Sequence, residues 1–94
     1  MVSFELERER ACLPDLHWRV ALPSGLEPGA LIERLRQLGA DDRSPNRLVR
    51  LFCLPSGHRV VLVPKTGRIQ LRLCTTSVVA ERVGLAQALA QSLF

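Results

Sequence analysis

Few side chains in this sequence have the types and spacing that catalysis or metal binding requires. Its only imidazoles are His17 and His58, and neither has a cysteine, histidine or carboxylate partner at a zinc-ligand or Glu-x-x-His spacing. Cys53 and His58 could act as a nucleophile and a general base across a hairpin, but such neighbours more often only pack together. We therefore predict that the protein is not an enzyme and has no catalytic residue, no metal site and no cofactor.

Two further features could bind ligands. Asp41 and Asp42 are adjacent carboxylates that could hold a cation, although their turn-rich surroundings explain them as solvated loop residues. Gly57 and Gly67 stand singly in predicted hairpins, and the sequence contains no glycine-rich phosphate-binding loop. No small-molecule substrate is indicated.

The basic residues carry the remaining chemistry. The formal net charge is +4, and of the 13 basic residues all but Lys65 are arginines. Guanidinium groups suit phosphate and carboxylate partners, because their planar donors can bind two oxygens at once. A surplus of this size favours a polyanionic partner without requiring one.

These side chains must be positioned by a single domain over residues 1–94, because a chain of 94 residues with 47% hydrophobic content has room for one core. Alternation of apolar and polar residues predicts an N-terminal edge strand within residues 1–13. It predicts a clearer strand over 16–22, with Trp18 pointing inward and Arg19 outward. Pro28, the leucine spacing and a capping Gly39 then predict a helix.

The second half of the chain begins with a polar loop over 40–47. Strands are predicted over 48–54, 58–63 and 68–74, joined by tight turns. A final helix follows, capped by hydroxyl groups within 75–77 and weakened by Gly84 by about 1 kcal/mol relative to alanine. Its inward residues are predicted to be Val79, Val83, Ala86, Ala90 and Leu93. The fold class is therefore α+β: an antiparallel curved sheet of four to five strands with two helices on one face.

The uncovered face of this sheet is predicted to be basic and partly apolar. Strand alternation places on it His17, Arg19, Leu48, Arg50, Phe52, Leu62, Arg68, Gln70 and Arg72. Guanidinium groups beside apolar side chains suit phosphates together with sugars or base edges. The same face could instead be simply solvated, as many antiparallel sheet faces are. Its large apolar residues argue against that, because solvated faces have less reason to expose them, and they fit an interface with another protein equally well.

The segment from residue 15 to 94 resembles one of the two repeats of the TATA-binding protein core. Residues 44–48, Ser-Pro-Asn-Arg-Leu, resemble the Asn-Pro-Lys-Arg-Phe entry to that repeat's second strand. Residues 61–68 resemble its Leu-Ile-Phe-Ser-Ser-Gly-Lys hairpin. The order strand, helix, three strands, helix is also similar.

The resemblance implies a sheet face that binds the DNA minor groove. Phenylalanines that wedge between base steps in that family are matched here by Leu48 and Pro64, so TATA-specific recognition is not implied. The family joins two repeats, so a single repeat implies a homodimer. Its seam would be the strand over 16–22, unless the N-terminal strand covers that edge. Similar single domains stand at the N-terminus of one class of bacterial ribonuclease H, where they are thought to hold a nucleic-acid hybrid.

We therefore expect a small non-catalytic binding module that binds nucleic acid through its sheet. The alternative is a protein-protein interaction or homodimerisation module that uses the same face or edge. The residues expected to contact nucleic acid are Arg19, Leu48, Arg50, Phe52, Leu62, Pro64, Arg68 and Arg72.

Two features of the sequence bear on where in the cell the protein is located. Residues 1–10 lack an uninterrupted apolar segment, and no stretch approaches the length needed to span a bilayer, so no membrane partner is expected. Cys12, Cys53 and Cys74 are odd in number and widely spaced, which predicts reduced, buried thiols. Both features predict a cytoplasmic protein.

Overall fold

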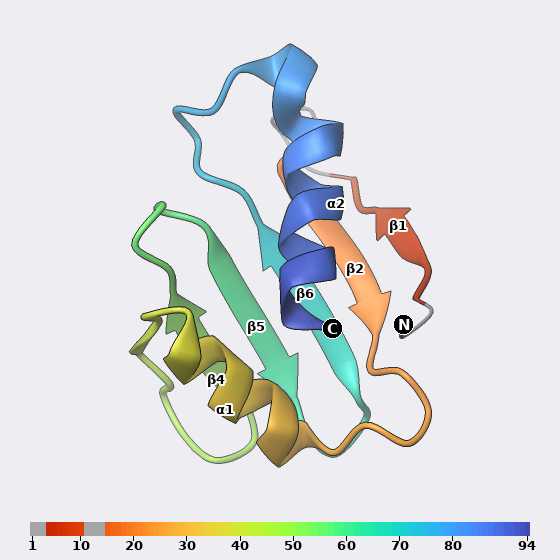
Figure 1. Cartoon of the computed structure of the whole chain (residues 1–94), viewed down its shortest axis with the longest axis vertical. Coiled ribbons are helices and arrows are strands. Elements are labelled where there is room, and N and C mark those ends of the chain that lie inside the picture. The colour runs from red at the N-terminus through yellow and green to blue at the C-terminus, as the bar shows by residue number, and fades with distance from the viewer. Residues whose placement is uncertain (1–3, 11–14) are drawn as a thin grey trace.

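The structure is a computed structural model and describes residues 4–10 and 15–94. Its strands form one antiparallel sheet in the order β1-β2-β6-β5-β4-β3 (Figure 1). They are β1 (Leu6–Arg8), β2 (His17–Ala21), β3 (Asp41–Asp42), β4 (Arg50–Cys53), β5 (Arg59–Val63) and β6 (Arg68–Arg72). The α+β class with an antiparallel sheet and two helices is thus confirmed.

The sheet has six strands, so the expected number of four to five was too low. The additional strand is β3, in a segment expected to be a loop. Asp41 pairs with Cys53 and Asp42 with Phe52, so the chain adds a short edge strand before it turns back into β4. Two acidic residues have little intrinsic preference for a strand, so their strand conformation comes from the pairing with β4.

β1 lies against β2, with Leu6 opposite Val20 and Arg8 opposite Trp18. The N-terminal edge strand was expected within residues 1–13, of which 1–3 and 11–13 lie outside the described residues. The guanidinium of Arg8 lies 5.4 Å from the Trp18 ring centroid and pairs with Asp15 at 2.9 Å. β1 therefore covers the edge of β2 that a homodimer seam would have used.

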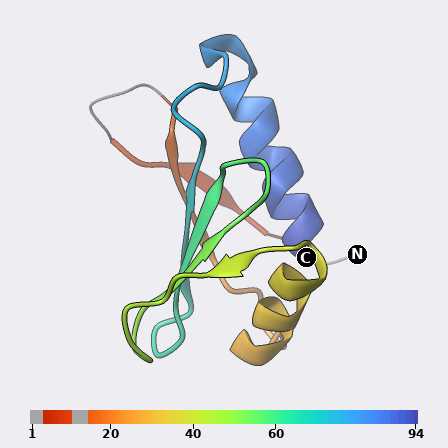
Figure 2. The ribbon, with the colours of Figure 1, turned by 90° about the vertical axis from the view of Figure 1, so that its left-hand side faces the viewer.

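Both helices cover the same face of the sheet (Figure 2). α1 (Pro28–Gln37) begins and ends as predicted, with proline at its first position and Gly39 at a left-handed φ of 81° after its end. α2 (Arg82–Leu93) follows a short 3₁₀ turn, η1 (Val79–Glu81). Arg34 of α1 donates to the carbonyl of Ser92 at 2.9 Å and so connects the helices.

The start of the final helix differs from the prediction in two ways. The N-cap residues of η1 and α2, Val78 and Glu81, make no side-chain cap hydrogen bond to the described residues; Ser77 instead donates to the carbonyl of Cys74 and accepts from Arg82. Val79 and Val83 are exposed, whereas Ala86, Ala90 and Leu93 are buried as expected. The 3₁₀ turn changes the angular position of the first residues relative to an ideal helix, which turns Val79 away from the sheet.

The core lies between the helices and the sheet. Trp18 is 5% exposed while Arg19 is exposed, so the predicted orientation of β2 is confirmed. The largest fully buried side chains are Phe52, Leu31, Leu35, Leu62, Ile69, Leu71, Val20 and Val60. No helix among the described residues combines the length and the hydropathy needed to cross a membrane.

Candidate nucleic-acid interface

The face of the sheet opposite α1 and α2, called the open face here, is the candidate interface (Figure 2). Strand register and burial place on it Glu7, His17, Arg19, Ala21, Leu51, Cys53, Arg59, Val61, Val63, Arg68, Gln70 and Arg72. At its centre, half-buried Leu51 pairs with half-buried Val61, and Val63 follows on the same side of β5. The open face thus has an apolar strip with basic residues around it.

Phe52 and Leu62 do not belong to this face. Both are 0% exposed in the core, so the prediction that they point outward was wrong. On β5 the run Val60, Val61, Leu62, Val63 is apolar in both alternating sets, and nothing within it decides which set points inward. The two helices decide it, because the larger residues fill the space beneath them.

Arg50 was also misplaced by the prediction. It lies on the same side of β4 as Phe52, opposite Leu62, with its guanidinium 5.5 Å from the Phe52 ring centroid. It pairs with the Asp42 carboxylate at 2.7 Å and donates to the Ser44 hydroxyl at 2.9 Å. Arg50 therefore closes the loop between β3 and β4 and is not presented on the open face.

The same loop determines the ionisation of Asp42. The hydroxyl and the backbone N–H of Ser44, and then Arg50, hold the pKa of Asp42 at about 2, below its ordinary 3.8. Asp41 pairs separately with Arg43 at 2.6 Å. The two carboxylates are thus engaged with different partners rather than forming one cation site.

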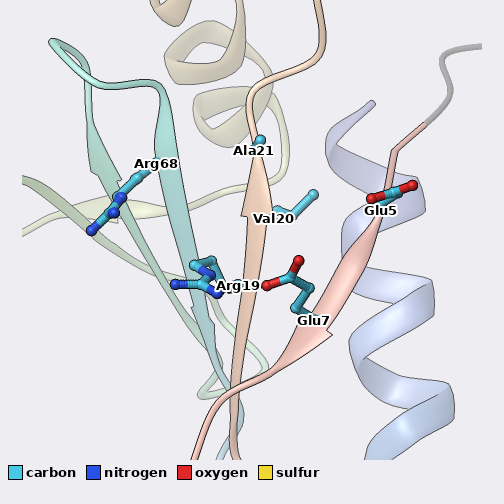
Figure 3. Close-up of a pocket in the computed structure, with 6 residues that line it drawn as sticks. All are labelled: Glu5, Glu7, Arg19, Val20, Ala21 and Arg68. Carbon is cyan, nitrogen blue, oxygen red and sulfur yellow. Dashed lines mark hydrogen bonds and ion pairs between the residues drawn. The ribbon is translucent and has the colours of Figure 1, made fainter.

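Arg19 lies on the open face as expected, but a carboxylate accompanies it. Its guanidinium is 2.6 Å from Glu7 of β1, and Figure 3 shows the two side chains directed toward each other between the strands. Glu7 and, more weakly, Glu9 raise the pKa of Arg19. The charge of Arg19 is therefore largely balanced within the protein.

Arg68 and Arg72 are the two predicted residues that keep an uncompensated charge on the open face. Arg68 is exposed and makes no ion pair or side-chain hydrogen bond to any described residue. Arg72 donates through Nε to Gln70 at 2.9 Å, and Gln70 in turn donates to the Glu9 carboxylate at 3.2 Å. This chain of contacts fixes the orientation of Arg72 without pairing it to an acid.

Leu48 and Pro64 occupy loops at one end of the sheet. Leu48 is 69% exposed, whereas Pro64 is half-buried in the turn between β5 and β6. Figure 2 shows both loops projecting past the end of the sheet, on the side away from α1. The asparagine before Leu48 shapes its loop, since the Asn46 side chain accepts from the N–H groups of Leu48 and Val49.

Sequence reasoning missed Arg59, Leu51, Val61 and Val63 on the open face. One signal was available: Arg59 begins β5, and an outward arginine there would have placed Val61 and Val63 outward as well. Arg50 gave the opposite signal on β4. If Arg50 is assumed to lie on the open face, strand alternation places Phe52, two residues later, on the same face.

Within the part of the chain that the structure describes, no side-chain hydrogen bond joins Cys53 and His58, the residues considered for catalysis. The ring Nδ1 of His58 accepts from the backbone N–H of Cys74 at 2.9 Å, and burial lowers the pKa of His58. Cys53 and Cys74 are free and only half-buried, rather than fully buried as expected; Cys12 lies outside the described residues. Within residues 4–10 and 15–94, no three His, Cys, Asp or Glu side chains form a group that could hold a metal ion.

Comparisons of the chain with protein-family models, with curated proteins and with solved structures gave no significant match.

Proposed function

We propose that this protein is a non-catalytic module that binds the phosphate backbone of nucleic acid through the open face. The observation that carries the proposal is that Arg59, Arg68 and Arg72 lie on a sheet face that no helix covers, without a carboxylate partner among the described residues. Phosphate oxygens are the common partners of such guanidinium groups. The neighbouring strip of Leu51 and Val61 would contact sugars or base edges.

The arrangement of elements supports the resemblance to a TATA-binding protein repeat. After β2, the chain forms α1, the two-residue strand β3, the longer pairing strands β4, β5 and β6, and then α2, so that β3 is an addition to the expected order. The loops that contain Leu48 and Pro64 extend past the same end of the sheet, as apolar wedges would have to. Because aliphatic residues replace the paired phenylalanines, the proposed contact is with backbone and groove rather than with a TATA sequence.

The covered edge of β2 and the free thiols bear on how copies of the protein would associate and on the compartment in which it would act. β1 occupies the edge of β2, so two copies that extend one binding surface would have to meet elsewhere than at that edge. Cys53 and Cys74 are free thiols, which agrees with a reducing compartment such as the cytoplasm.

Binding to a duplex and to a DNA–RNA hybrid should depend steeply on salt. Fluorescence anisotropy between about 50 and 200 mM salt should show affinity falling linearly on a log–log plot. Arg68→Gln and Arg72→Gln should each weaken binding and reduce the slope by about one counterion. The matched control is Arg36→Gln, which removes the same charge from an exposed position on α1, on the helix side of the sheet. Absent or salt-insensitive binding, or equal effects of Arg36→Gln and Arg72→Gln, would reject the proposal.

A second candidate is a protein-interaction or self-association module that uses the same face. It is favoured by the apolar strip of Leu51, Val61 and Val63, whose neighbours on β6 are polar Gln70 and basic Arg68, with acidic Glu7 farther along the same face. Mixed charge around an apolar centre is typical of protein interfaces. Sedimentation at dilute and high concentration tests self-association, and Val61→Glu should abolish any dimer that forms through this face.

A further inference from the structure

Three basic side chains lie in one row across the open face. His17 of β2 is directly opposite Arg72 of β6, and Arg72 is directly opposite Arg59 of β5. Directly opposed residues of an antiparallel pair have Cα atoms about 4.5 to 5.5 Å apart. Two guanidinium groups and an imidazole therefore converge at one end of the sheet.

This opposition of like charges costs stability. Arginines in directly paired positions repel each other. The row continues through Cys53 of β4 to Asp41 of β3, whose carboxylate pairs with Arg43. Among the described residues no carboxylate pairs with Arg59 or Arg72, because Glu7 is engaged by Arg19 and Glu9 by Gln70. An anion bound between the two arginines would remove the repulsion.

The row lines a hollow of about 310 Å³. Its walls come from the turn at Gly57 and from the segment that begins at Cys74. Gly57 has a left-handed φ of 91°, and a Cβ there would come within 3.2 Å of the Cys74 sulfur, so glycine lets the turn approach this wall closely. The hydrogen bond from the Cys74 backbone to His58 fixes the same wall from behind.

Arg72 is oriented before any ligand arrives. Gln70 engages its Nε, and the other guanidinium nitrogens make no hydrogen bond to a described residue. Because Gln70 is itself bound by Glu9, the guanidinium plane is fixed at little further entropy cost on binding. Arg59 makes no ion pair or side-chain hydrogen bond within residues 4–10 and 15–94.

We propose that this hollow binds a terminal phosphomonoester of a nucleic-acid strand, held by Arg59 and Arg72 with His17 beside them. The inference rests on the proposed function and adds to it a defined end-binding pocket. A phosphomonoester carries about −1.5 to −2 charges at neutral pH and three terminal oxygens, whereas an internal diester carries one charge and two free oxygens. Two arginines in one hollow match the first better than the second.

The test compares oligonucleotides of one sequence that carry a 5′-phosphate, a 3′-phosphate or hydroxyl groups at both ends. Fluorescence anisotropy should show at least about tenfold tighter binding of one phosphorylated strand than of the hydroxyl strand. Arg59→Gln and Arg72→Gln should each remove that preference. Arg68→Gln makes the same change as Arg72→Gln on the same β-strand, β6, but outside the hollow. It should weaken the binding of all three oligonucleotides equally and keep the preference for the phosphorylated one.

Inorganic phosphate provides the second arm of the experiment. Titration monitored by amide chemical shifts should move residues around 57–59 and 72–75 in the native protein and not in Arg59→Gln. The same spectra show that each variant is folded. Arg59→Lys should restore part of the phosphate response, since the charge returns without the bidentate geometry.

The outcomes separate the two proposals. Equal binding of all three strands overturns the end pocket and leaves the proposed function standing. Phosphate shifts without binding of any strand show that the hollow binds phosphate, but they overturn its assignment to a nucleic-acid end and reject the proposed function. If neither phosphate nor any strand binds, both proposals are rejected.

Discussion

On β4 and β5, residues of similar type lie on opposite sides of one sheet. Leu62 is 0% exposed beneath the helices, whereas its neighbour Val61 and the paired Leu51 are half-buried on the open face. The arginines divide in the same way: Arg50, on the helix-covered side, has an acid and a hydroxyl as partners, while Arg59 on the open face has neither among residues 4–10 and 15–94. The covered side requires each group to be packed or paired, and the open face does not.

The two faces should respond very differently to the same leucine truncation. Leu62→Ala should lower the free energy of unfolding by about 2 to 5 kcal/mol, because it leaves a cavity under the helices. Leu51→Ala should cost about 1 kcal/mol or less, because solvent can fill the space on the open face. Urea denaturation measures both. Equal losses would mean that the register of β4 and β5 is not the one described.

Replacing a buried arginine should likewise cost more stability than replacing an arginine on the open face. Arg82 is 5% exposed and donates to the Thr75 carbonyl at 3.3 Å, the Ser77 carbonyl at 3.0 Å and the Ser77 hydroxyl at 3.2 Å. Arg82→Gln should therefore cost about 2 kcal/mol of unfolding free energy. Arg68→Gln, with no such contacts, should change it by about 0.5 kcal/mol or less. A large loss in Arg68→Gln would show that this arginine supports the fold.

Two glycines outside the sheet differ in the same way, since one has open space around it and the other is closely packed. A Cβ at Gly84 of α2 would meet nothing within 4 Å, so Gly84→Ala should stabilise the protein by about 0.5 to 1 kcal/mol through helix propensity. Gly57→Ala should destabilise it, because φ there is 91° and the Cys74 sulfur is 3.2 Å from the new Cβ. Thermal unfolding distinguishes the two, and a destabilised Gly84→Ala would show that the outer side of α2 is in contact.

The smallest expected effect concerns His58, which is half-buried just before β5. Burial lowers its pKa below the ordinary 6.5, so the folded state favours the neutral ring. The stability that neutral His58 contributes is fully present above its ordinary pKa, and it is lost as the pH falls toward the lowered pKa of the folded state. Protonation of Nδ1 would also remove the acceptor for the Cys74 N–H. Unfolding free energies at about pH 7.5 and 5.5 should differ more in the native protein than in His58→Gln.

Much of the fold could be predicted because its signals are local. Trp18 and Arg19 alternate on β2 with no ambiguity, and Pro28 and Gly39 mark the ends of α1. The final helix was predicted at its buried end, where Ala86 and Ala90 pack, and mispredicted at its start, where a 3₁₀ turn exposes Val79. Such a turn depends on how the preceding segment is anchored, and local propensity does not report that.

The candidate site was harder to predict than the fold. Arg68 and Arg72 were placed correctly because β6 alternates cleanly between apolar and polar residues. Phe52 and Leu62 were placed on the wrong face because β4 and β5 carry apolar residues in both alternating sets. A shift of one position reverses the face of every side chain, so one misleading arginine at position 50 moved the whole strand.

The sequence by itself determined most of the strands and both helices, since alternation, helical spacing and turn residues act over a few positions. The strand β3 and the 3₁₀ turn η1 came from the tertiary structure. The sequence also determined that the basic residues are almost all arginines. Only the tertiary structure decided which arginines are paired: Glu7 lies against Arg19 across β1 and β2, Asp42 pairs with Arg50 across a loop, and no acid of the described residues pairs with Arg59. Whether a charge is compensated depends on which groups the fold brings within a few ångströms, and spacing along the chain does not contain that information.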